Sequence, residues 1–455
     1  MDDDKRIWRP TRVARYTKDV IHHIHHMKKA YIISGGTFVS VAPHFSLAAP
    51  AFGAIGRQLA PLLADSFEKT IQSKETHLLL TRMALGGAER SESEQVLLRA
   101  AHVKDLATND DLEKLIDHLI TLRDTSMIVL AAAICDFIPD RTSEARFSSS
   151  EHQTLQLIPD EKIIRKIRRV RKDIFLVGFK TTTGATPDEQ YLAGLNLVKT
   201  ASCNLVLAND LTTRLNMVIT PEQSRYHETT DRDAAVRGLA EMSALRSKLT
   251  FTRATIVPGE PVAWSSPLVP QVLREIVDHC IDRGAYKPFL NATVGHFAIK
   301  VDDRTILTSR RKTDFNTLEK IGLVKIIAEN DNEVIAYGSK PSVGGQSQRI
   351  IFKEHPGMDC IVHFHCPKKP ESSVPVRSQR EFECGSHECG KNTSTGLMRF
   401  GNLLAVMLDK HGPNIVFSST IDPQEVIDFI EKHFELEGRT DEVKMSVGAL
   451  AYATT

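Results

Sequence analysis

Residues 127–135 read Met-Ile-Val-Leu-Ala-Ala-Ala-Ile-Cys, and this unbroken apolar run constrains the fold more than any other segment. Such a run is typical of a strand that is buried on both faces of a parallel sheet. Shorter apolar strands are predicted at residues 30–34 and 77–80, and a helical face repeats over residues 112–122. Strand and helix alternating at this spacing predict an α/β fold with a parallel sheet, which binds ligands at the carboxyl ends of its strands.

The length of the chain and one proline-rich stretch define its domain organisation. The chain has 455 residues, roughly three times the ~150 residues of a common domain. Its clearest break is at residues 258–270, where four prolines gather. Past it we expect strands at 297–301, 305–308, 333–337 and 360–365, and helices at 272–283, 315–327, 397–408 and 423–434. We predict a first domain at residues 1–257, a linker at 258–270 and a second α/β domain at 271–455.

Composition excludes several classes of partner and location. The 58 basic and 57 acidic side chains give a net charge of +1, so we expect no nucleic-acid partner and no attraction to an anionic membrane. No apolar run reaches the ~18 residues of a membrane-spanning helix. The acidic start, Met-Asp-Asp-Asp, argues against a signal peptide, and seven cysteines fit a reducing compartment. We therefore expect a cytoplasmic protein.

Small residues follow the first predicted strand and suit phosphate binding. Gly35, Gly36 and Thr37 offer open backbone N–H groups and a hydroxyl. Gly53 stands just before the next predicted helix, where a phosphate would approach the helix N-terminus. Asp136 follows the apolar run at residues 127–135. A plain turn for the glycines and a cap or turn role for Asp136 are the alternatives.

In their order and spacing these pieces resemble the phosphopantothenoylcysteine synthetase family, the ligases of coenzyme A biosynthesis. The matching stretches are residues 32–37, 131–137, 177–180 and 205–210. The resemblance implies a Rossmann-like parallel sheet that binds a nucleotide. It also implies a reaction that joins 4′-phosphopantothenate to cysteine through an acyl-nucleotide intermediate, with ATP or CTP and Mg²⁺.

The resemblance assigns roles to individual residues. It places Leu130, Ala131, Ala132, Asp136 and Phe179 around the base and ribose, Gly35, Gly36, Thr37 and Gly53 near the phosphates, Asn209 and Asp210 at the closing wall, and Lys199 as a source of positive charge. The implied catalytic residues are Arg146, Asp136 and Asn209.

Two departures from the family weaken the implied reaction machinery. The family's Asn, which handles the acyl intermediate, and the Ser-Ser-Gly after it are replaced by Leu-Ala-Ala-Pro-Ala-Phe-Gly at residues 47–53. A family lysine becomes Arg146, which keeps the charge but has a planar fork in place of a point donor.

In the C-terminal half, the sequence Ile-Val-His-Phe-His at residues 361–365 is the strongest short signal. In a strand, His363 and His365 point to the same face. His411, expected at the end of the helix predicted at 397–408, would complete the three nitrogens of an open zinc site. A structural role for the histidine pair is the alternative. Cys384, His387 and Cys389 are candidates for a second zinc site or for a further ligand to the first.

These features resemble the class II aldolase/adducin family over roughly residues 268–440. Its Gly-Asn-x-Ser motif corresponds to residues 295–298, where His296 replaces the Asn, and its phosphate loop corresponds to residues 308–311. The resemblance implies a divalent metal, usually zinc, held by His363, His365 and His411. The family's proton-transferring glutamate falls at Gly344, so aldolase activity is doubtful.

Three functions follow, of which we rank the ligase first. The second is a zinc-dependent aldolase or epimerase of a sugar phosphate, and the third is a non-catalytic binding or assembly protein built from both scaffolds. The expected partners are a nucleotide and a small phosphorylated substrate. Both families also imply a homo-oligomer.

Overall fold

The computed structural model describes residues 28–289 and 291–440. They divide into two compact units, Met1–Gly178 and Phe179–Thr455. The division falls inside strand β8 (Phe175–Thr182). The predicted boundary at residues 258–270 stays a prediction.

A parallel sheet forms the centre of the first unit. Strand β1 (Lys28–Gly36) pairs in parallel with β4 (Lys74–Leu80) on one side and with β5 (Thr125–Ala133) on the other. The first half of β8 pairs in parallel with β5. The predicted parallel sheet is therefore confirmed, and β5 is the apolar run of residues 127–135 shifted by two residues.

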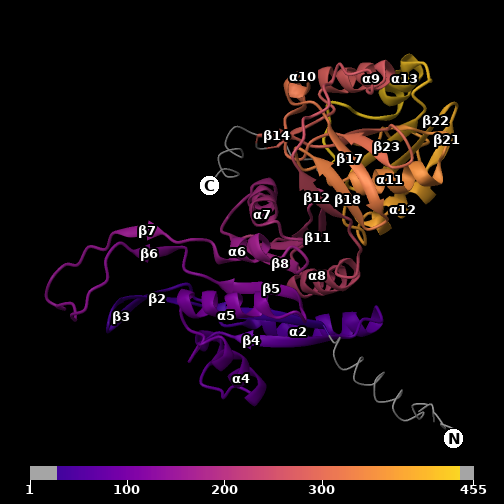
Figure 1. The fold of residues 1–455 in the computed structure, drawn as a ribbon. Helices are drawn as coiled ribbons and strands as arrows, with labels where there is room; N and C mark the ends of the chain where they lie inside the picture. The colour runs from indigo at the N-terminus through magenta and orange to yellow at the C-terminus, as the bar shows by residue number, and fades with distance from the viewer. Residues whose placement is uncertain (1–27, 290, 441–455) are drawn as a thin grey trace, which may run out of the picture. The chain divides into compact units, whose positions relative to one another are not determined.

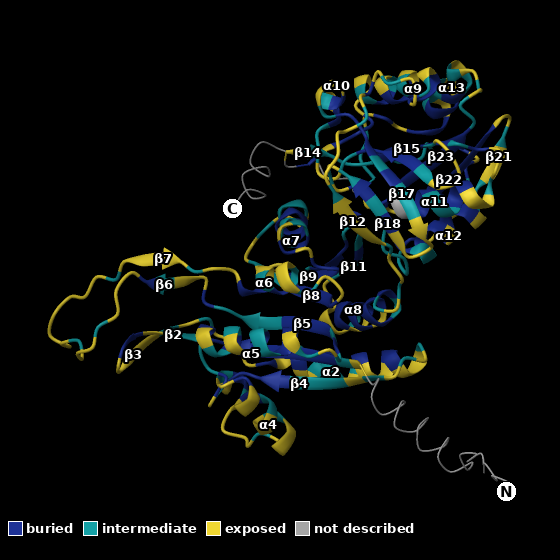
Figure 2. Cartoon of the chain, viewed as in Figure 1, coloured by how far each residue is buried: buried dark blue, intermediate teal, exposed yellow. Residues whose placement is uncertain are grey.

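Helices and two hairpins complete the first unit. The helices are α2 (Ala54–Lys69), α3 (Arg82–Leu85), α4 (Glu92–Ala100), α5 (Asn109–Thr121) and α6 (Ile163–Val170). One hairpin joins β2 (Phe38–Ala42) to β3 (Phe45–Ala48), and the other joins β6 (Phe137–Pro139) to β7 (Leu157–Pro159). Figure 1 shows the β6–β7 hairpin and its loop projecting away from the sheet of this unit. Strand β7 is exposed along its whole length (Figure 2).

The second unit begins with α7 (Pro187–Ala201) and then β9 (Leu205–Asp210), β10 (Asn216–Ile219), β11 (Arg225–Thr229) and α8 (Arg232–Arg246). Strand β10 runs antiparallel between β9 and β11. Helix α7 packs on β9, because its face of buried residues includes Leu195 and Val198.

A ten-stranded mixed sheet follows in the same unit. In sheet order its strands are β12 (Arg253–Val257), β18 (Glu333–Tyr337), β17 (Val324–Asn330), β16 (Thr305–Thr308), β15 (His296–Lys300), β19 (Cys360–His363), β23 (Gly412–Phe417), β22 (Leu403–Leu408) and β20 (Val376–Arg377), with β21 (Met398–Phe400) beside β22. Strand β12 pairs in parallel with β18 although it precedes the predicted linker. The remaining paired segments are β13 (Pro288–Phe289) and β14 (Ala292–Thr293).

Alternate residues of this sheet support two apolar cores. Val362 faces a core that contains residues of α9 (Gln271–Asp282) and α13 (Pro423–His433). Ile361 faces the other core, which contains residues of α11 (Gly345–Glu354). Helix α12 (His387–Gly396) packs against α11. No helix of the described residues is long and apolar enough to cross a membrane.

Two predicted helices are wrong. Residues 397–408 form the hairpin β21–β22, because Gly401 adopts a φ of +56° and turns the chain. Residues 315–327 form a 3-10 turn (Phe315–Thr317) and the short helix α10 (Leu318–Ile321), which ends before Gly322 with a φ of +58°. The chain then continues as β17. The prediction of one long helix failed because a short apolar run is typical of buried strands and of buried helices alike.

Candidate metal centre and candidate nucleotide site

Three histidines converge in the second unit. His363 ends β19, His365 follows two residues later, and His411 lies in the turn between β22 and β23. One ring nitrogen of each lies within 4.8 Å of the others. The antiparallel pairing of His363 with Asn414 brings the His411 turn beside β19. A Cβ at Gly412 would lie 2.0 Å from the carbonyl oxygen of Phe364, so this close turn requires glycine.

The protonation of these rings suits metal binding. His363 Nδ1 lies 2.7 Å from the carbonyl oxygen of Pro413, which only accepts, so Nδ1 carries the proton and Nε2 offers its lone pair. Burial lowers the pKa of His363 to about 4. Burial also lowers the pKa values of His365 and His411 well below the usual range. The imidazoles are therefore neutral near pH 7, which is the form that binds metals.

The spacing of the rings also fits a zinc-type ion. His363 Nε2 and His411 Nε2 are 3.2 Å apart. Two Zn–N bonds of ~2.05 Å at a tetrahedral angle place their nitrogens about 3.3 Å apart. Three protein ligands would leave one coordination position open, as in catalytic zinc sites. The donor set thus fits a divalent metal.

His296 occupies the space beside this centre. Its ring stacks on His363 with a centroid distance of 4.7 Å, and its Nδ1 lies 2.6 Å from Gln348 Nε2, which donates. A Cβ built at Gly344 would lie 2.3 Å from His296 Nε2. The aldolase/adducin resemblance places the family's glutamate at position 344, and the imidazole of His296 occupies the space beside Gly344. Sequence reasoning recorded His296 only as a departure from Asn.

Lys199 belongs to the surroundings of the histidines. Its Nζ donates to the carbonyl oxygen of Pro221 at 2.7 Å. Burial lowers its pKa to about 8. Its positive charge contributes to the lowered pKa values of His365 and His411, so the ammonium lies within electrostatic reach of both. The sequence assigned Lys199 to the nucleotide site.

The Cys384, His387 and Cys389 candidates do not form a ligand group among the described residues. The His387 ring bonds Thr252 Oγ1 at 2.8 Å, and the Cys389 thiol contacts Gln379. Burial raises the pKa of both thiols, which keeps them protonated.

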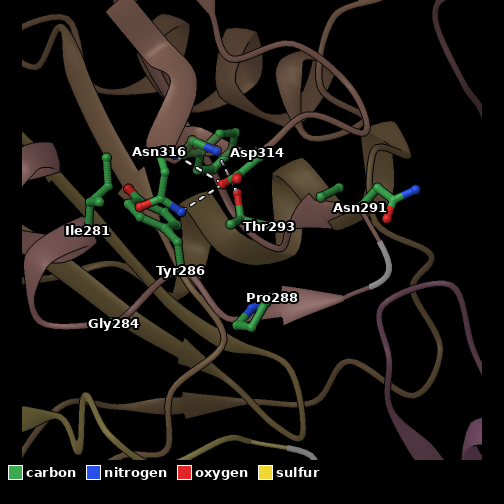
Figure 3. Close-up of a pocket in the computed structure, with 10 residues that line it drawn as sticks. Ile281, Gly284, Tyr286, Pro288, Asn291, Thr293, Asp314 and Asn316 are labelled. Carbon is green, nitrogen blue, oxygen red and sulfur yellow. Dashed lines mark hydrogen bonds between the residues drawn. The ribbon is translucent and has the colours of Figure 1, made fainter. Parts of the chain in front are cut away.

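A separate cavity of about 550 Å³ lies near α9 and β13 in the second unit (Figure 3). The Asp314 carboxylate in its wall accepts from the backbone N and Nδ2 of Asn316 at 3.0 and 2.7 Å. Thr293 Oγ1 donates to the carbonyl oxygen of Thr313. These polar groups bond within the protein, and the metal-type histidines do not line the cavity.

In the first unit, the predicted phosphate loop and the apolar strand lie side by side. Gly35 pairs with Ala132 and Gly36 with Ala133 at the carboxyl ends of β1 and β5. A Cβ at Gly35 would lie 2.1 Å from Thr81 Oγ1, so close packing requires this glycine. The Gly36 N–H donates to Ala51 at 2.7 Å, so this group serves the loop's own structure.

Thr37 belongs to a hydrogen-bond network that sequence reasoning missed. Its backbone N–H donates to Ala133 at 3.0 Å, and its hydroxyl donates to Asn109 Oδ1 at 2.6 Å. Asn109 Nδ2 donates to the carbonyl oxygen of Cys135 at 2.9 Å and to the Asp160 carboxylate at 2.8 Å. The capping box of Thr108 and Asp111 signals the start of α5 at Asn109, but the contact with Thr37 is tertiary.

Helix α2 begins near the loop that follows β1, and the first turn of a helix has backbone N–H groups without a partner inside the helix. Gly53 is the N-cap with a φ of +75° and makes no side-chain cap. Exposed N–H groups at a helix N-terminus attract anions. The phosphate role of Gly53 stays a prediction.

Asp136 and Arg146 are both exposed. Asp136 follows β5 and forms an ion pair with Lys162. Arg146 lies in the loop between β6 and β7. Leu130 is buried in β5, and Ala131 and Ala132 are partly exposed at its end.

Phe179 and Asn209 lie in the second unit. Asn209, at the end of β9, accepts from Thr181 Oγ1 at 3.2 Å. The neighbouring Asp210 accepts four backbone N–H groups, from Gly184, Ala185, Thr212 and Thr213. These bonds hold its pKa well below the usual range, so Asp210 stays ionised and organises the surrounding loops.

Comparison with known protein families finds two separate matches along the chain. Residues 91–243 match the DNA/pantothenate metabolism flavoprotein C-terminal domain, abbreviated DFP, and residues 275–369 match the class II aldolase and adducin N-terminal domain. One stretch of the chain is thus similar to DFP domains, and a later stretch is similar to class II aldolase/adducin domains.

Curated relatives match part of the chain. The coenzyme A biosynthesis bifunctional protein CoaBC of Thermococcus kodakarensis is 30% identical over 107 residues, which are 24% of this chain and 27% of that protein. CoaBC of Methanocaldococcus jannaschii is 30% identical over 108 residues, 24% of this chain and 26% of that protein. The chain thus spans about a quarter of the length of these relatives.

Solved structures that align with parts of the chain include a pantothenate-metabolism flavoprotein and an aldolase. The DNA/pantothenate metabolism flavoprotein from Streptococcus pneumoniae is 19% identical and aligns over 46% of this chain and 95% of that one, with a TM-score of 0.36. L-fuculose 1-phosphate aldolase is 13% identical over 40% of this chain and 93% of that one, with a TM-score of 0.28.

Proposed function

We propose that the chain is a phosphopantothenate–cysteine ligase-like enzyme of coenzyme A biosynthesis whose second half carries a separate divalent metal site. The match of residues 91–243 to the DFP domain carries the proposal. The likeness to two CoaBC proteins supports it. The parallel sheet of the first unit has the architecture that binds ligands at the carboxyl ends of its strands.

The proposed reaction has two steps. The carboxylate of phosphopantothenate attacks the α-phosphate of ATP or CTP and releases pyrophosphate, with Mg²⁺ neutralising the phosphate charge. The cysteine amine then attacks the acyl-nucleotide, forms the amide bond and releases the nucleoside monophosphate. Both steps develop negative charge on phosphate oxygens, which cationic side chains and helix N-termini stabilise.

Named residues take the following roles in the proposal. Leu130, Ala131 and Ala132 border the base and ribose. Gly53 at the start of α2 receives phosphate, and the Gly35, Gly36 and Thr37 loop positions that edge. Asp136 contacts the nucleotide, and Arg146 approaches the acyl phosphate from its exposed loop.

The proposed zinc-type site consists of His363, His365 and His411. Bound there, a divalent metal supplies Lewis acidity and an open coordination position. The absence of a carboxylate at Gly344 argues against the aldolase reaction of the family. A binding or assembly role in a homo-oligomer is the second candidate for this half, because the three histidines are present while Gly344 supplies no carboxylate.

Thermal denaturation with nucleotide tests the ligase proposal. A ligand at a hundred times its dissociation constant stabilises a protein by about 2.7 kcal/mol. We expect millimolar ATP or CTP with Mg²⁺ to raise the melting temperature, and Asp136→Asn to reduce the rise. Asp65→Asn, on the surface of α2, is the matched control and should show the same rise in melting temperature as the wild type. No shift with either nucleotide would contradict the proposal.

A further inference from the structure

The histidine centre has neighbours from outside the aldolase/adducin match. Residues 220–224 form the turn from β10 into β11 within the DFP match. Ser224 Oγ donates to the carbonyl oxygen of Lys410 at 2.6 Å, and Lys410 Nζ donates to that of Arg225 at 3.2 Å. Lys410 directly precedes His411 and adopts a φ of +55°. The β10–β11 turn therefore fixes the backbone that carries one of the three histidines.

The same turn holds Lys199 in place. Pro221, at the start of the turn, accepts from Lys199 Nζ at 2.7 Å. The next residue, Glu222, accepts from Cys384 N at 2.5 Å and from Arg246 Nη1 at 3.0 Å. The carboxylate of Glu222 is thus bound by other donors, and the Lys199 ammonium keeps further N–H groups for a ligand.

Positive charge gathers around Lys199. Lys312 Nζ donates to the carbonyl oxygen of Lys199 at 3.5 Å. The charges of Arg311 and Lys312 act on the Lys199 ammonium against the opposite charge of Glu222, which Arg246 also binds. A divalent metal on the histidines would add to this charge. Cations that converge in a partly buried region are stabilised by an anion between them.

We propose that Lys199 of the DFP domain completes the histidine centre of the aldolase/adducin domain, by binding the anionic group of a small ligand whose other oxygen occupies the open metal position. The site is then a composite of both families' segments, which gives a physical reason for their presence in one chain. This inference rests on the proposed metal site and is independent of the proposed ligase reaction.

Cobalt(II) in place of zinc gives a readout confined to the metal site. We would load the full-length chain with cobalt(II), titrate it with inorganic phosphate and follow the visible absorption of the cobalt. Phosphate should change the wild-type spectrum, and Lys199→Met should weaken the apparent affinity at least tenfold. Lys199→Arg, which keeps the charge, should stay within about threefold, which is ~0.7 kcal/mol.

Two further variants make the result decisive. Lys391→Met, exposed on α12, is the matched control and should bind phosphate like the wild type. His363→Ala should abolish the cobalt spectrum itself, which identifies the signal. An unchanged phosphate affinity in Lys199→Met would overturn the proposal, as would a wild-type spectrum that phosphate does not alter. Failure of nucleotide to stabilise the chain would affect only the ligase proposal.

Discussion

Gly344 faces the imidazole of His296 so closely that a Cβ on Gly344 would lie 2.3 Å from His296 Nε2. Gln348 Nε2 fixes the other side of the ring at 2.6 Å. The ring also stacks on His363. The imidazole of His296 therefore occupies the space that a side chain at position 344 would need.

We predict that Gly344→Glu destabilises the protein and does not install aldolase activity. Overpacking of a well-packed site typically costs about 1–3 kcal/mol. The double variant Gly344→Glu with His296→Asn should recover part of this loss, because it removes the obstructing ring. Urea denaturation and an aldol-cleavage assay measure both effects. Gly357→Ala, where a Cβ meets nothing within 4 Å, is the control. If Gly344→Glu were as stable as the wild type, the close packing of Gly344 against His296 would be contradicted.

A second prediction concerns metal content. Protein purified without an affinity tag should hold about one equivalent of a divalent metal, and His363→Ala or His411→Ala should lose it. His355→Ala, whose ring bonds Ser394, should keep it. Elemental analysis measures the metal content. Histidines 22, 23, 25 and 26 are unchanged in these variants, so subtracting the metal content of a variant from that of the wild type removes any metal that they bind. Equal metal in wild type and His363→Ala would refute the site.

A third prediction concerns pH. His227 Nε2 accepts from Arg380 Nε and Nη2 at 3.2 and 3.1 Å. Burial and then the charge of Arg380 lower the pKa of His227 in the folded state. The unfolded chain binds a proton more readily, so this residue stabilises the fold above about pH 6.5 and the contribution is lost as the pH falls below that value.

His227→Gln tests this dependence, because its amide accepts from Arg380 without titrating. Between pH 7.5 and 5.5 the variant should lose less unfolding free energy than the wild type. Other buried histidines titrate in both proteins, so the difference between the two pH profiles isolates His227. Identical profiles would show that His227 has no lowered pKa.

A fourth prediction concerns the buried ion pair of Arg246 and Glu222. Both side chains are fully buried, with Nη1 and Oε2 3.0 Å apart. Arg246 also donates to the carbonyl oxygens of Gln379 and Arg380, each at 3.0 Å. Arg246→Leu leaves a buried carboxylate unpaired, so we expect a loss of about 3–5 kcal/mol.

The double variant Arg246→Leu with Glu222→Leu should lose less than the sum of the single variants, because no charge remains unpaired. Arg237→Leu, exposed on the same helix α8, should change the unfolding free energy by less than about 0.5 kcal/mol. Chemical denaturation measures the unfolding free energies of the two single variants, the double variant and Arg237→Leu. Additive losses would argue against a coupled pair.

Periodicity predicted much of the fold because the strongest signals are local. The apolar run at residues 127–135 became β5, and the alternation at 361–365 placed two histidines on one face. The helix predicted at 397–408 failed because buried strands and buried helices share the same composition. His411 lies close to His363 and His365 as predicted, although the segment before it is a hairpin and not a helix.

The contacts that sequence reasoning missed are tertiary. His296 meets His363 through the register of β15 on β19, which no local pattern encodes. Thr37 and Asn109 are 72 residues apart in the sequence. The family resemblance gives Lys199 a place in the nucleotide site, which stays a prediction, whereas its bond to Pro221 in the β10–β11 turn is a tertiary contact that no local pattern indicates.

Product formation tests the central claim most directly. The full-length chain would be incubated with 4′-phosphopantothenate, cysteine, Mg²⁺ and either ATP or CTP, and phosphopantothenoylcysteine and pyrophosphate would be quantified. We predict that both products form in equal amounts with at least one nucleotide, and that Asp136→Asn reduces them. Neither product appearing with either nucleotide, from folded protein, would contradict the account.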